Sequence, residues 1–441
     1  MSLTGFWQAS EHRRLWALSV PMLLANLTTP LIGLVDTAVL GHMGGTAPLA
    51  GAAIGSLILT QIYWVCGFLR MSSTGLSAQA YGRGSNVQSS KVLLQGGTVA
   101  LVLAMLLWLL QVPLVQAGIF LSDASQQLQP ILSAYFHTRV WGAPAALLNL
   151  VVIGWLIGRQ QTRQVLYIQI VGNLLNALLD GVFVYGLEYG VTGVAAASVI
   201  AEYTMLVLGI LTVRQVLPNL RWTPAWLRMR ALKPLVLINN DMLIRNLALQ
   251  LCLAYLTLQG ARYGTHVAAV NALLMQFFAL IALGLDAVAY GVEALMGEYK
   301  GRKDQRRMWL TLWRGLFWSQ GLAVLYCLVF AGGFSGIVAL LTDSAALRED
   351  ARGYYVITLA MPLIAHVCFL LDGVFVGLTR AKAMRNSMLL SALGVYFPLC
   401  LLWLDWQNHG LWWALLAFMA ARGVTLGGYA IWLLGYRRQA V

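Results

Sequence analysis

Apolar runs long enough to form membrane-spanning helices recur along the whole chain and leave little sequence for anything else. A helix needs about 20 apolar residues to cross the hydrocarbon core of a bilayer. Only 10% of the 441 residues are charged and 59% are hydrophobic, so the chain lacks the polar surface of a soluble protein. We therefore expect an all-α polytopic membrane protein, and not a soluble enzyme or a disulfide scaffold. Twelve spans are predicted at 15–40, 48–70, 92–115, 130–158, 164–187, 192–214, 234–260, 266–296, 310–341, 354–378, 386–405 and 410–436.

Lys and Arg alternate between the connections that join these spans. The two ends and the even-numbered connections carry 21 basic residues, whereas the odd-numbered connections carry three. The positive-inside rule then places both termini in the cytoplasm. The same bias accounts for the net charge of +13, so we expect no nucleic-acid partner.

The two halves of the chain share a weak internal repeat. GHMGGT begins at Gly41 and GARYGT begins at Gly260, a shift of 219 residues. The same shift maps Tyr135 onto Tyr354, and Gly154 and Gly158 onto Gly373 and Gly377. We predict an N-terminal six-helix bundle over 1–216, a cytoplasmic linker over 217–233 and a C-terminal six-helix bundle over 234–441. Both bundles enter the membrane from the same side, so the repeats are expected to be parallel.

No enzyme signature is present, and the chain has no Walker motif. A transporter of this kind would draw on an ion gradient, so H⁺ or Na⁺ is expected as the coupling ion and no other cofactor. An ionisable group within the membrane would then have to change its occupancy between states.

Two carboxylates in the N-terminal half are the main candidates for that group. Asp36 lies deep in the first predicted helix, and Asn173, Asn176 and Asp180 are spaced i, i+3, i+7 on one face of the fifth. Asp36 and Asp180 with Asn176 could bind Na⁺ through oxygen atoms, or the two acids could share a proton. The alternative is a hydrogen-bonded patch that only holds helices together.

Other polar and aromatic residues are candidates for weaker roles. Asp241 and Arg245 are expected to form an ion pair at i, i+4, and Glu202 a contact between helices. Asp286 and Glu293 share one face of the eighth helix, either for function or for packing. Pro21 and Pro30 favour a kink in the first helix before Asp36. The substrate cavity is predicted to include Tyr135, Gln61, Asn173, Phe277, Met275, Asp286 and Asp372.

The segments PMLLANLTTPLIGLVDTAVLGHMGG, LRMSSTGLSAQAYGRG, GNLLNALLDGVFVYG and LDGVFVGLTRAKAMRNSM resemble the multidrug and toxic compound extrusion (MATE) transporters, most closely their DinF branch in bacteria. This resemblance implies a V-shaped pair of six-helix bundles in the inner membrane. It also implies drug export coupled to H⁺ or Na⁺ entry, with protonation of Asp36 bending the first helix at Pro21. Asn176 and Asp180 match coupling positions of that branch, and Ser198 falls at its helix 6 hydroxyl position, where relatives often carry Thr. The NorM branch uses acids in helices 7 and 10; Asp372 is present here, but helix 7 lacks a matching carboxylate.

Three other interpretations compete with a drug antiporter that acts as a monomer on small organic substrates in the lipid bilayer. A flippase for lipids or lipid-linked oligosaccharides would need a basic cavity, whereas the N-terminal half contains buried acids. A major-facilitator transporter would carry a basic motif in the second connection, which here reads AYGRGSNVQSSK. A structural or receptor protein would not need a polar stripe facing buried acids.

Overall fold

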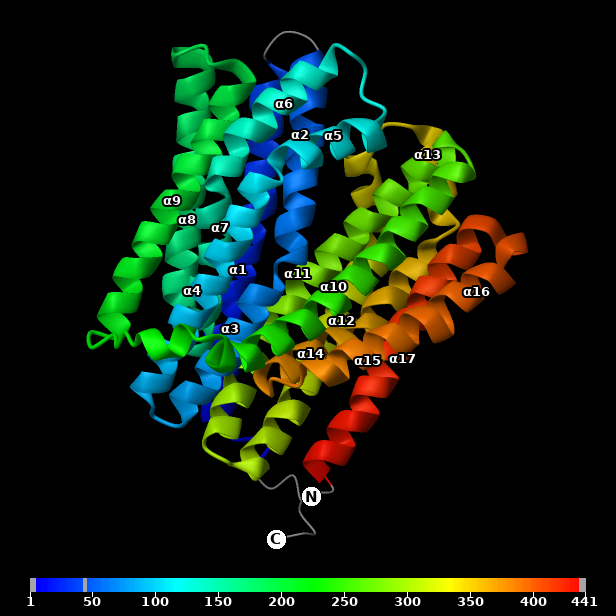
Figure 1. The fold of residues 1–441 in the computed structure, drawn as a ribbon. Helices are drawn as coiled ribbons and strands as arrows, with labels where there is room; N and C mark the ends of the chain where they lie inside the picture. The colour runs from blue at the N-terminus through cyan, green and yellow to red at the C-terminus, as the bar shows by residue number, and fades with distance from the viewer. Residues whose placement is uncertain (1–4, 43–45, 436–441) are drawn as a thin grey trace. The chain divides into compact units, whose positions relative to one another are not determined.

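The computed structural model describes residues 5–42 and 46–435, and all regular structure in these two ranges is helical (Figure 1). Among them, twelve helical segments are long and apolar enough to cross a membrane. Each overlaps one of the twelve predicted spans. The prediction of an all-α polytopic membrane protein is therefore confirmed, and the count of spans is correct.

The chain divides into two compact units. The N-terminal unit is Val20–Val236, and the C-terminal unit combines Met1–Ser19 with Leu237–Val441. This division differs from the predicted boundaries at two places: the first 19 residues group with the C-terminal half, and the linker 217–233 groups with the N-terminal unit. The chain therefore passes from one unit to the other within its first helix, between Ser19 and Val20.

The helices of the N-terminal unit pack side by side as a bundle. The first helix, α1, runs from Ala9 to Gly41 and so begins in the other unit. The helices that follow are α2 (Thr46–Val65), α3 (Phe68–Gly82), α4 (Asn86–Leu109), α5 (Gln111–Ser122), α6 (Leu128–Arg139), α7 (Ala143–Gly158), α8 (Thr162–Gly181) and α9 (Gly190–Val216). A short 3-10 helix, η3 (Pro224–Leu227), lies in the linker.

Eight further α-helices follow within the described residues, and all of them lie in the C-terminal unit except the beginning of α10, which belongs to the N-terminal unit as far as Val236. A large apolar core, which includes Phe277, Phe330 and Trp412, joins them. The helices are α10 (Met229–Arg262), α11 (Thr265–Gly301), α12 (Gln305–Leu341), α13 (Ala345–Arg352), α14 (Tyr355–Gly377), α15 (Ala381–Ser391), α16 (Phe397–Leu402) and α17 (Gln407–Gly435).

The internal repeat predicted from the sequence is confirmed by two equivalent helix crossings. A Cβ atom on Gly158 of α7 would lie 2.5 Å from the Thr74 carbonyl and 2.7 Å from the Ala78 nitrogen on α3. A Cβ on Gly377 of α14 would meet the carbonyl of Glu293 and the nitrogen of Gly297 on α11. Every residue of the second crossing is 219 positions after its equivalent in the first. Both crossings need glycine because two backbones approach closely there.

The turns that follow α3 and α11 repeat in the same register. Ser85 caps α4 by accepting a hydrogen bond from the Gln88 nitrogen, and Asp304 caps α12 by accepting one from the Arg307 nitrogen. Local hydrogen bonding as well as helix packing is therefore duplicated. Residues 43–45 of the GHMGGT string lie outside the described residues, so that part of the match has no structural test.

Candidate coupling site

The first helix is continuous through both of its prolines. α1 is helical from Ala9 to Gly41, with Pro21 buried and Pro30 exposed. Proline removes one backbone hydrogen bond at each of these positions. The boundary between the two units lies between Ser19 and Val20, so Pro21 is nearer to it than Pro30 is.

Asp36 of α1 contacts Asp180 of α8 in the N-terminal unit. The two carboxyl groups lie close enough to interact with each other, and Asn176 Nδ2 donates to Asp180 Oδ2 at 3.3 Å. Asp180 is fully buried, and Asn176 is 5% exposed. One oxygen of each carboxyl, Oδ1, is buried and has no hydrogen-bond partner in the described part of the chain. The two acids, which we call the acid pair, thus meet as predicted and retain unused acceptor capacity.

The predicted polar face of α8 packs against α1. Asn173 Nδ2 donates to Thr28 Oγ1 of α1 at 2.7 Å, two helical turns from the contact between Asp180 and Asp36. Beyond Asp180 the helix changes to a π-helical turn over Val182–Gly186. Such turns alter the helical register locally and often occur at functional sites. The i, i+3, i+7 spacing in the sequence thus correctly identified the face of α8 that packs against α1.

Ser198 is buried on α9, and its predicted role as a further coupling group stays a prediction. Tyr135 on α6 is also buried, at the close crossing of α6 with Gly55 of α2. Gln61 lies on the same helix α2 but is exposed. The predicted cavity residues of this unit therefore differ widely in their surroundings.

A buried ion pair joins α6 to α9. Arg139 donates from Nη1 to Glu202 Oε2 at 2.8 Å and from Nη2 to Glu202 Oε1 at 2.6 Å, a bidentate arrangement. Asn149 Nδ2 donates to the Glu202 backbone carbonyl at 2.9 Å. The Tyr63 ring lies 5.9 Å from the Arg139 guanidinium carbon. The sequence predicted a helix contact for Glu202 but did not identify its partner.

The sequence carried one signal for this pair that could have been used. Tyr135 and Arg139 are spaced i, i+4 and so lie on one face of α6. A charge one turn from a buried polar side chain in an apolar span needs a partner of opposite sign. Glu202, the one acid in the α9 span, would then have been the natural choice.

In the C-terminal unit, Asp372 of α14 is held by two arginines. Arg245 of α10 and Arg422 of α17 both bond to Asp372 Oδ2. Asp241 instead pairs with Arg385 of α15. The predicted i, i+4 pair of Asp241 with Arg245 is therefore wrong, because bonds to neighbouring helices replace it. An acid neutralised in this way is poorly suited to bind a second cation.

The other predicted cavity residues of this unit lie on α11. Phe277 is 1% exposed and packs at 5.1 Å, between ring centroids, from Phe330, so it belongs to the core in this structure. Met275 and Asp286 are half-buried, and Glu293 is 2% exposed. Met275 and Asp286 are therefore the more accessible members of this group, and their role in a cavity stays a prediction.

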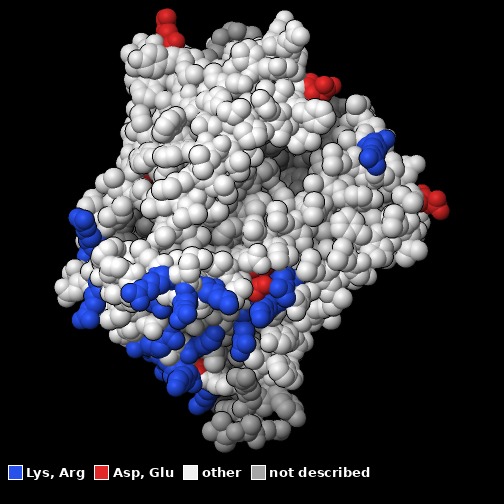
Figure 2. Space-filling view, viewed as in Figure 1, with Lys and Arg blue, Asp and Glu red and all other residues white. Residues whose placement is uncertain are grey.

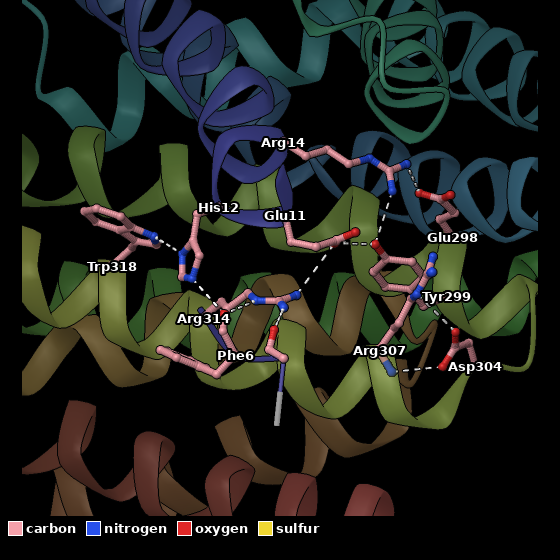
Figure 3. Close-up of polar contacts among 11 residues, drawn as sticks. Phe6, Glu11, His12, Arg14, Glu298, Tyr299, Asp304, Arg307, Arg314 and Trp318 are labelled. Atoms are coloured by element: carbon pink, nitrogen blue, oxygen red, sulfur yellow. Dashed lines mark hydrogen bonds and ion pairs between the residues drawn. The ribbon is translucent and has the colours of Figure 1, made fainter. Parts of the chain in front are cut away.

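The beginning of α1 forms a polar network with α11 and α12 inside the C-terminal unit (Figure 3). The Tyr299 hydroxyl donates to Glu11 Oε2 at 2.7 Å, and Arg14 Nη1 donates to that hydroxyl at 3.1 Å. Arg14 also pairs with Glu298, whose side chain is fully buried and has a second partner in Arg302. Acidic and basic side chains thus alternate where the beginning of α1 meets α11.

Arg314 of α12 fixes the segment that precedes α1. Its Nε donates to the Phe6 carbonyl at 3.0 Å, its Nη2 donates to the Gly5 carbonyl, and its Nη1 lies 3.6 Å from Glu11 Oε2. The Arg314 side chain is only 3% exposed. A buried arginine with three acceptors is well satisfied, so it holds this segment in one place.

The His12 ring completes this attachment. Trp318 Nε1 donates to His12 Nδ1 at 2.9 Å, and His12 Nε2 lies 2.8 Å from the Phe6 carbonyl. Because indole N–H can only donate, Nδ1 must accept and Nε2 must carry the proton. Figure 3 shows these side chains converging between α1 and α12.

Comparisons with known proteins agree with the resemblance to MATE transporters that the sequence segments indicated. The family model described as MatE matches residues 21–182 and 242–402, one copy in each half. The chain is 39% identical over 434 residues to DNA damage-inducible protein F of Escherichia coli, covering 97% of this chain and 93% of that one. It is 26% identical to a probable multidrug resistance protein NorM of Xylella fastidiosa, covering 95% and 91%. A crystal structure described as MATE in the bent conformation matches with a TM-score of 0.87, 14% identity, and 97% and 96% coverage.

Proposed function

Because this chain belongs to the MatE family, whose members are transporters and not enzymes, we propose that it is a secondary antiporter. It exports organic, often cationic, compounds in exchange for H⁺ taken up at the acid pair. The observation that carries this proposal is the contact between Asp36 and Asp180, with one buried oxygen of each left without a partner.

The chemistry of the acid pair suits proton exchange. A hydrogen bond between two carboxyl groups requires that one of them holds a proton. When that proton leaves, two negative charges face each other and the two acids can no longer hydrogen-bond to each other. The contact between α1 and α8 at the acid pair therefore depends on protonation, whereas the bond from Asn173 to Thr28 does not. Bending of α1 at Pro21 and alternating access are the steps we propose to follow from it.

Sodium is the alternative coupling ion. The unused oxygens of Asp36 and Asp180, with the Asn176 side-chain oxygen, are the hard donors that Na⁺ prefers. Ser198 would add a hydroxyl on the α9 side. These oxygen atoms suit either H⁺ or Na⁺, and the transport experiment described next distinguishes the two ions.

The test is dye transport in proteoliposomes under an imposed pH gradient and, separately, under an Na⁺ gradient. Asp36→Asn removes one charge of the acid pair with little change in volume. Asp405→Asn is the matched control, because it makes the same substitution at an exposed residue. We expect ethidium transport driven by the pH gradient in the wild type and the control, and none in Asp36→Asn.

Each outcome discriminates between the interpretations. Transport that responds only to the Na⁺ gradient would mean that the acid pair is the coupling site and that Na⁺, not H⁺, is the coupling ion. Equal transport by Asp36→Asn and the wild type overturns the assignment of Asp36. Folded wild-type protein that moves no dye under either gradient favours the lipid flippase, and labelled lipid is then the substrate to follow.

We further propose that the protein is a monomer in the inner membrane with both termini in the cytoplasm. The support for the cytoplasmic termini is the 21-to-3 distribution of basic residues between the two sets of connections. Arg437 and Arg438, at one of these ends, lie outside the described residues. A C-terminal green fluorescent protein fusion should be fluorescent, because that protein folds in the cytoplasm and not after export through the general pathway.

A further inference from the structure

The linker between the halves lies in a stretch of the chain that has several cations and no acid. No Asp or Glu occurs between Glu202 and Asp241, whereas five basic residues do. Two tryptophans lie between the first and second arginines of RWTPAWLRMR, which begins at Arg221. Basic residues interleaved with tryptophan are typical of segments at the surface of a membrane.

Chain connectivity places this segment at that surface. α9 ends at Val216 and α10 begins at Met229, and both helices are long and apolar enough to span the bilayer. The residues between them therefore lie where the spans leave the hydrocarbon. Figure 2 shows Lys and Arg side chains gathered on the face where this linker runs.

Two polar side chains of α4 hold the linker backbone in place. Gln95 Nε2 donates to the Trp226 carbonyl at 2.8 Å and to the Ala231 carbonyl at 3.0 Å. Ser90 Oγ accepts from the Arg221 nitrogen at 3.2 Å. Gln95 is 6% exposed and Ser90 is 1% exposed, so the linker covers them. The linker is thus a fixed element of the N-terminal unit.

The outer side of this fixed segment combines exposed apolar groups with cations. Trp222 is 64% exposed, Met229 is 78% exposed and Leu220 is 45% exposed. Arg221, Arg228 and Arg230 are exposed as well, and no ion pair joins them to a carboxylate in 5–42 or 46–435. We call these six residues the linker surface. Large apolar groups held in water are unfavourable, but the same groups are stable among lipid headgroups.

We propose that the linker surface binds the headgroups of anionic phospholipids, with Trp222 inserted beside them. Guanidinium groups bind phosphate in a bidentate manner, so the arginines would select acidic lipids over zwitterionic ones. Trp222, Leu220 and Met229 would occupy the boundary between headgroups and acyl chains. The inference requires a membrane protein but does not depend on the transported substrate.

The test uses the whole protein in nanodiscs made from phosphatidylglycerol and phosphatidylcholine. One of the two lipids is brominated near the headgroup end of its chains, so that it quenches nearby tryptophan. Subtracting the signal of Trp222→Phe isolates the fluorescence of Trp222. Binding is measured as the mole fraction of phosphatidylglycerol that gives half of the maximal quenching.

The triple variant Arg221→Gln/Arg228→Gln/Arg230→Gln should raise that mole fraction at least fivefold, since each arginine near the surface contributes about a fivefold preference. Arg83→Gln/Arg163→Gln/Lys382→Gln is the matched control, because it removes three exposed charges from other connections. It should change the value by less than about twofold. If the triple variant does not fold, Arg228→Gln alone should still give a severalfold increase.

Two results would overturn the proposal. In the first, brominated phosphatidylglycerol and phosphatidylcholine quench Trp222 equally in the wild type, which means that there is no headgroup selectivity. In the second, both triple variants shift the half-quenching fraction by the same factor, which means that total charge and not the linker surface selects the lipid.

Discussion

The ion pair between Arg139 and Glu202 should contribute strongly to stability only while both members are present. Its two hydrogen bonds, at 2.8 and 2.6 Å, lie in a buried setting between α6 and α9. Removing one partner leaves an uncompensated charge, which costs about 3–5 kcal/mol. Arg139→Gln and Glu202→Gln should therefore each lower the free energy of unfolding by about that amount.

The double variant should be more stable than either single variant. Two neutral side chains of similar length can hydrogen-bond to each other, so we expect the double change to cost about 2 kcal/mol or less. The excess cost of the single changes is then the penalty for a lone buried charge. It is not the net strength of the pair.

The assay is equilibrium unfolding in mixed micelles with increasing sodium dodecyl sulfate, followed by far-ultraviolet circular dichroism. The wild type, both single variants and the double variant form a double-mutant cycle. Additive losses, with the double variant the least stable of the four, would refute the reasoning. So would single variants that lose less than about 1 kcal/mol, because the charges would then be well hydrated.

Three further predictions concern packing and the polar networks. Gly158→Ala should cost about 1–3 kcal/mol in the same unfolding assay, because its Cβ would meet the α3 backbone; Gly428→Ala, where a Cβ meets nothing within 4 Å, should be neutral or slightly stabilising. Arg314→Gln should lower the stability of the C-terminal unit by about 3 kcal/mol or more, and should expose the chain before α1 to protease; unchanged cleavage there would contradict the network. Asp372→Asn should leave two arginines facing each other and reduce the yield of monodisperse protein, whereas normal yield and thermal stability would show that Asp372 is not their essential partner.

The sequence was sufficient to predict features that repeat or depend on local periodicity. The span count follows from hydropathy, and the α8 face follows from the i, i+3, i+7 spacing of Asn173, Asn176 and Asp180. The 219-residue shift appears in the glycines because two backbones touch at Gly158 and at Gly377. These features need no knowledge of which distant helices meet.

Pairings between distant helices were beyond the same reasoning. The predicted pair of Asp241 with Arg245 used the nearest cation along one helix, yet tertiary packing offers Asp241 a partner in Arg385. Arg139 and Glu202 are 63 residues apart, and the i, i+4 spacing of Tyr135 and Arg139 indicates that Arg139 needs a partner without showing which helix supplies it. The inclusion of residues before Ser19 in the C-terminal unit likewise depends on a helix that crosses from one unit to the other.

The attachment of the N-terminal segment also has a consequence for how the protein is made. Glu11 binds Tyr299, which is translated 288 residues later, and the Phe6 carbonyl binds Arg314, translated 308 residues later. Residues Phe6 and Glu11 of the nascent chain therefore remain without these partners while the whole N-terminal unit is inserted. They reach their final position only when α12 has left the ribosome. Chains arrested before Arg314 should have a protease-sensitive N-terminus, and chains arrested well beyond α12 should have a protected one.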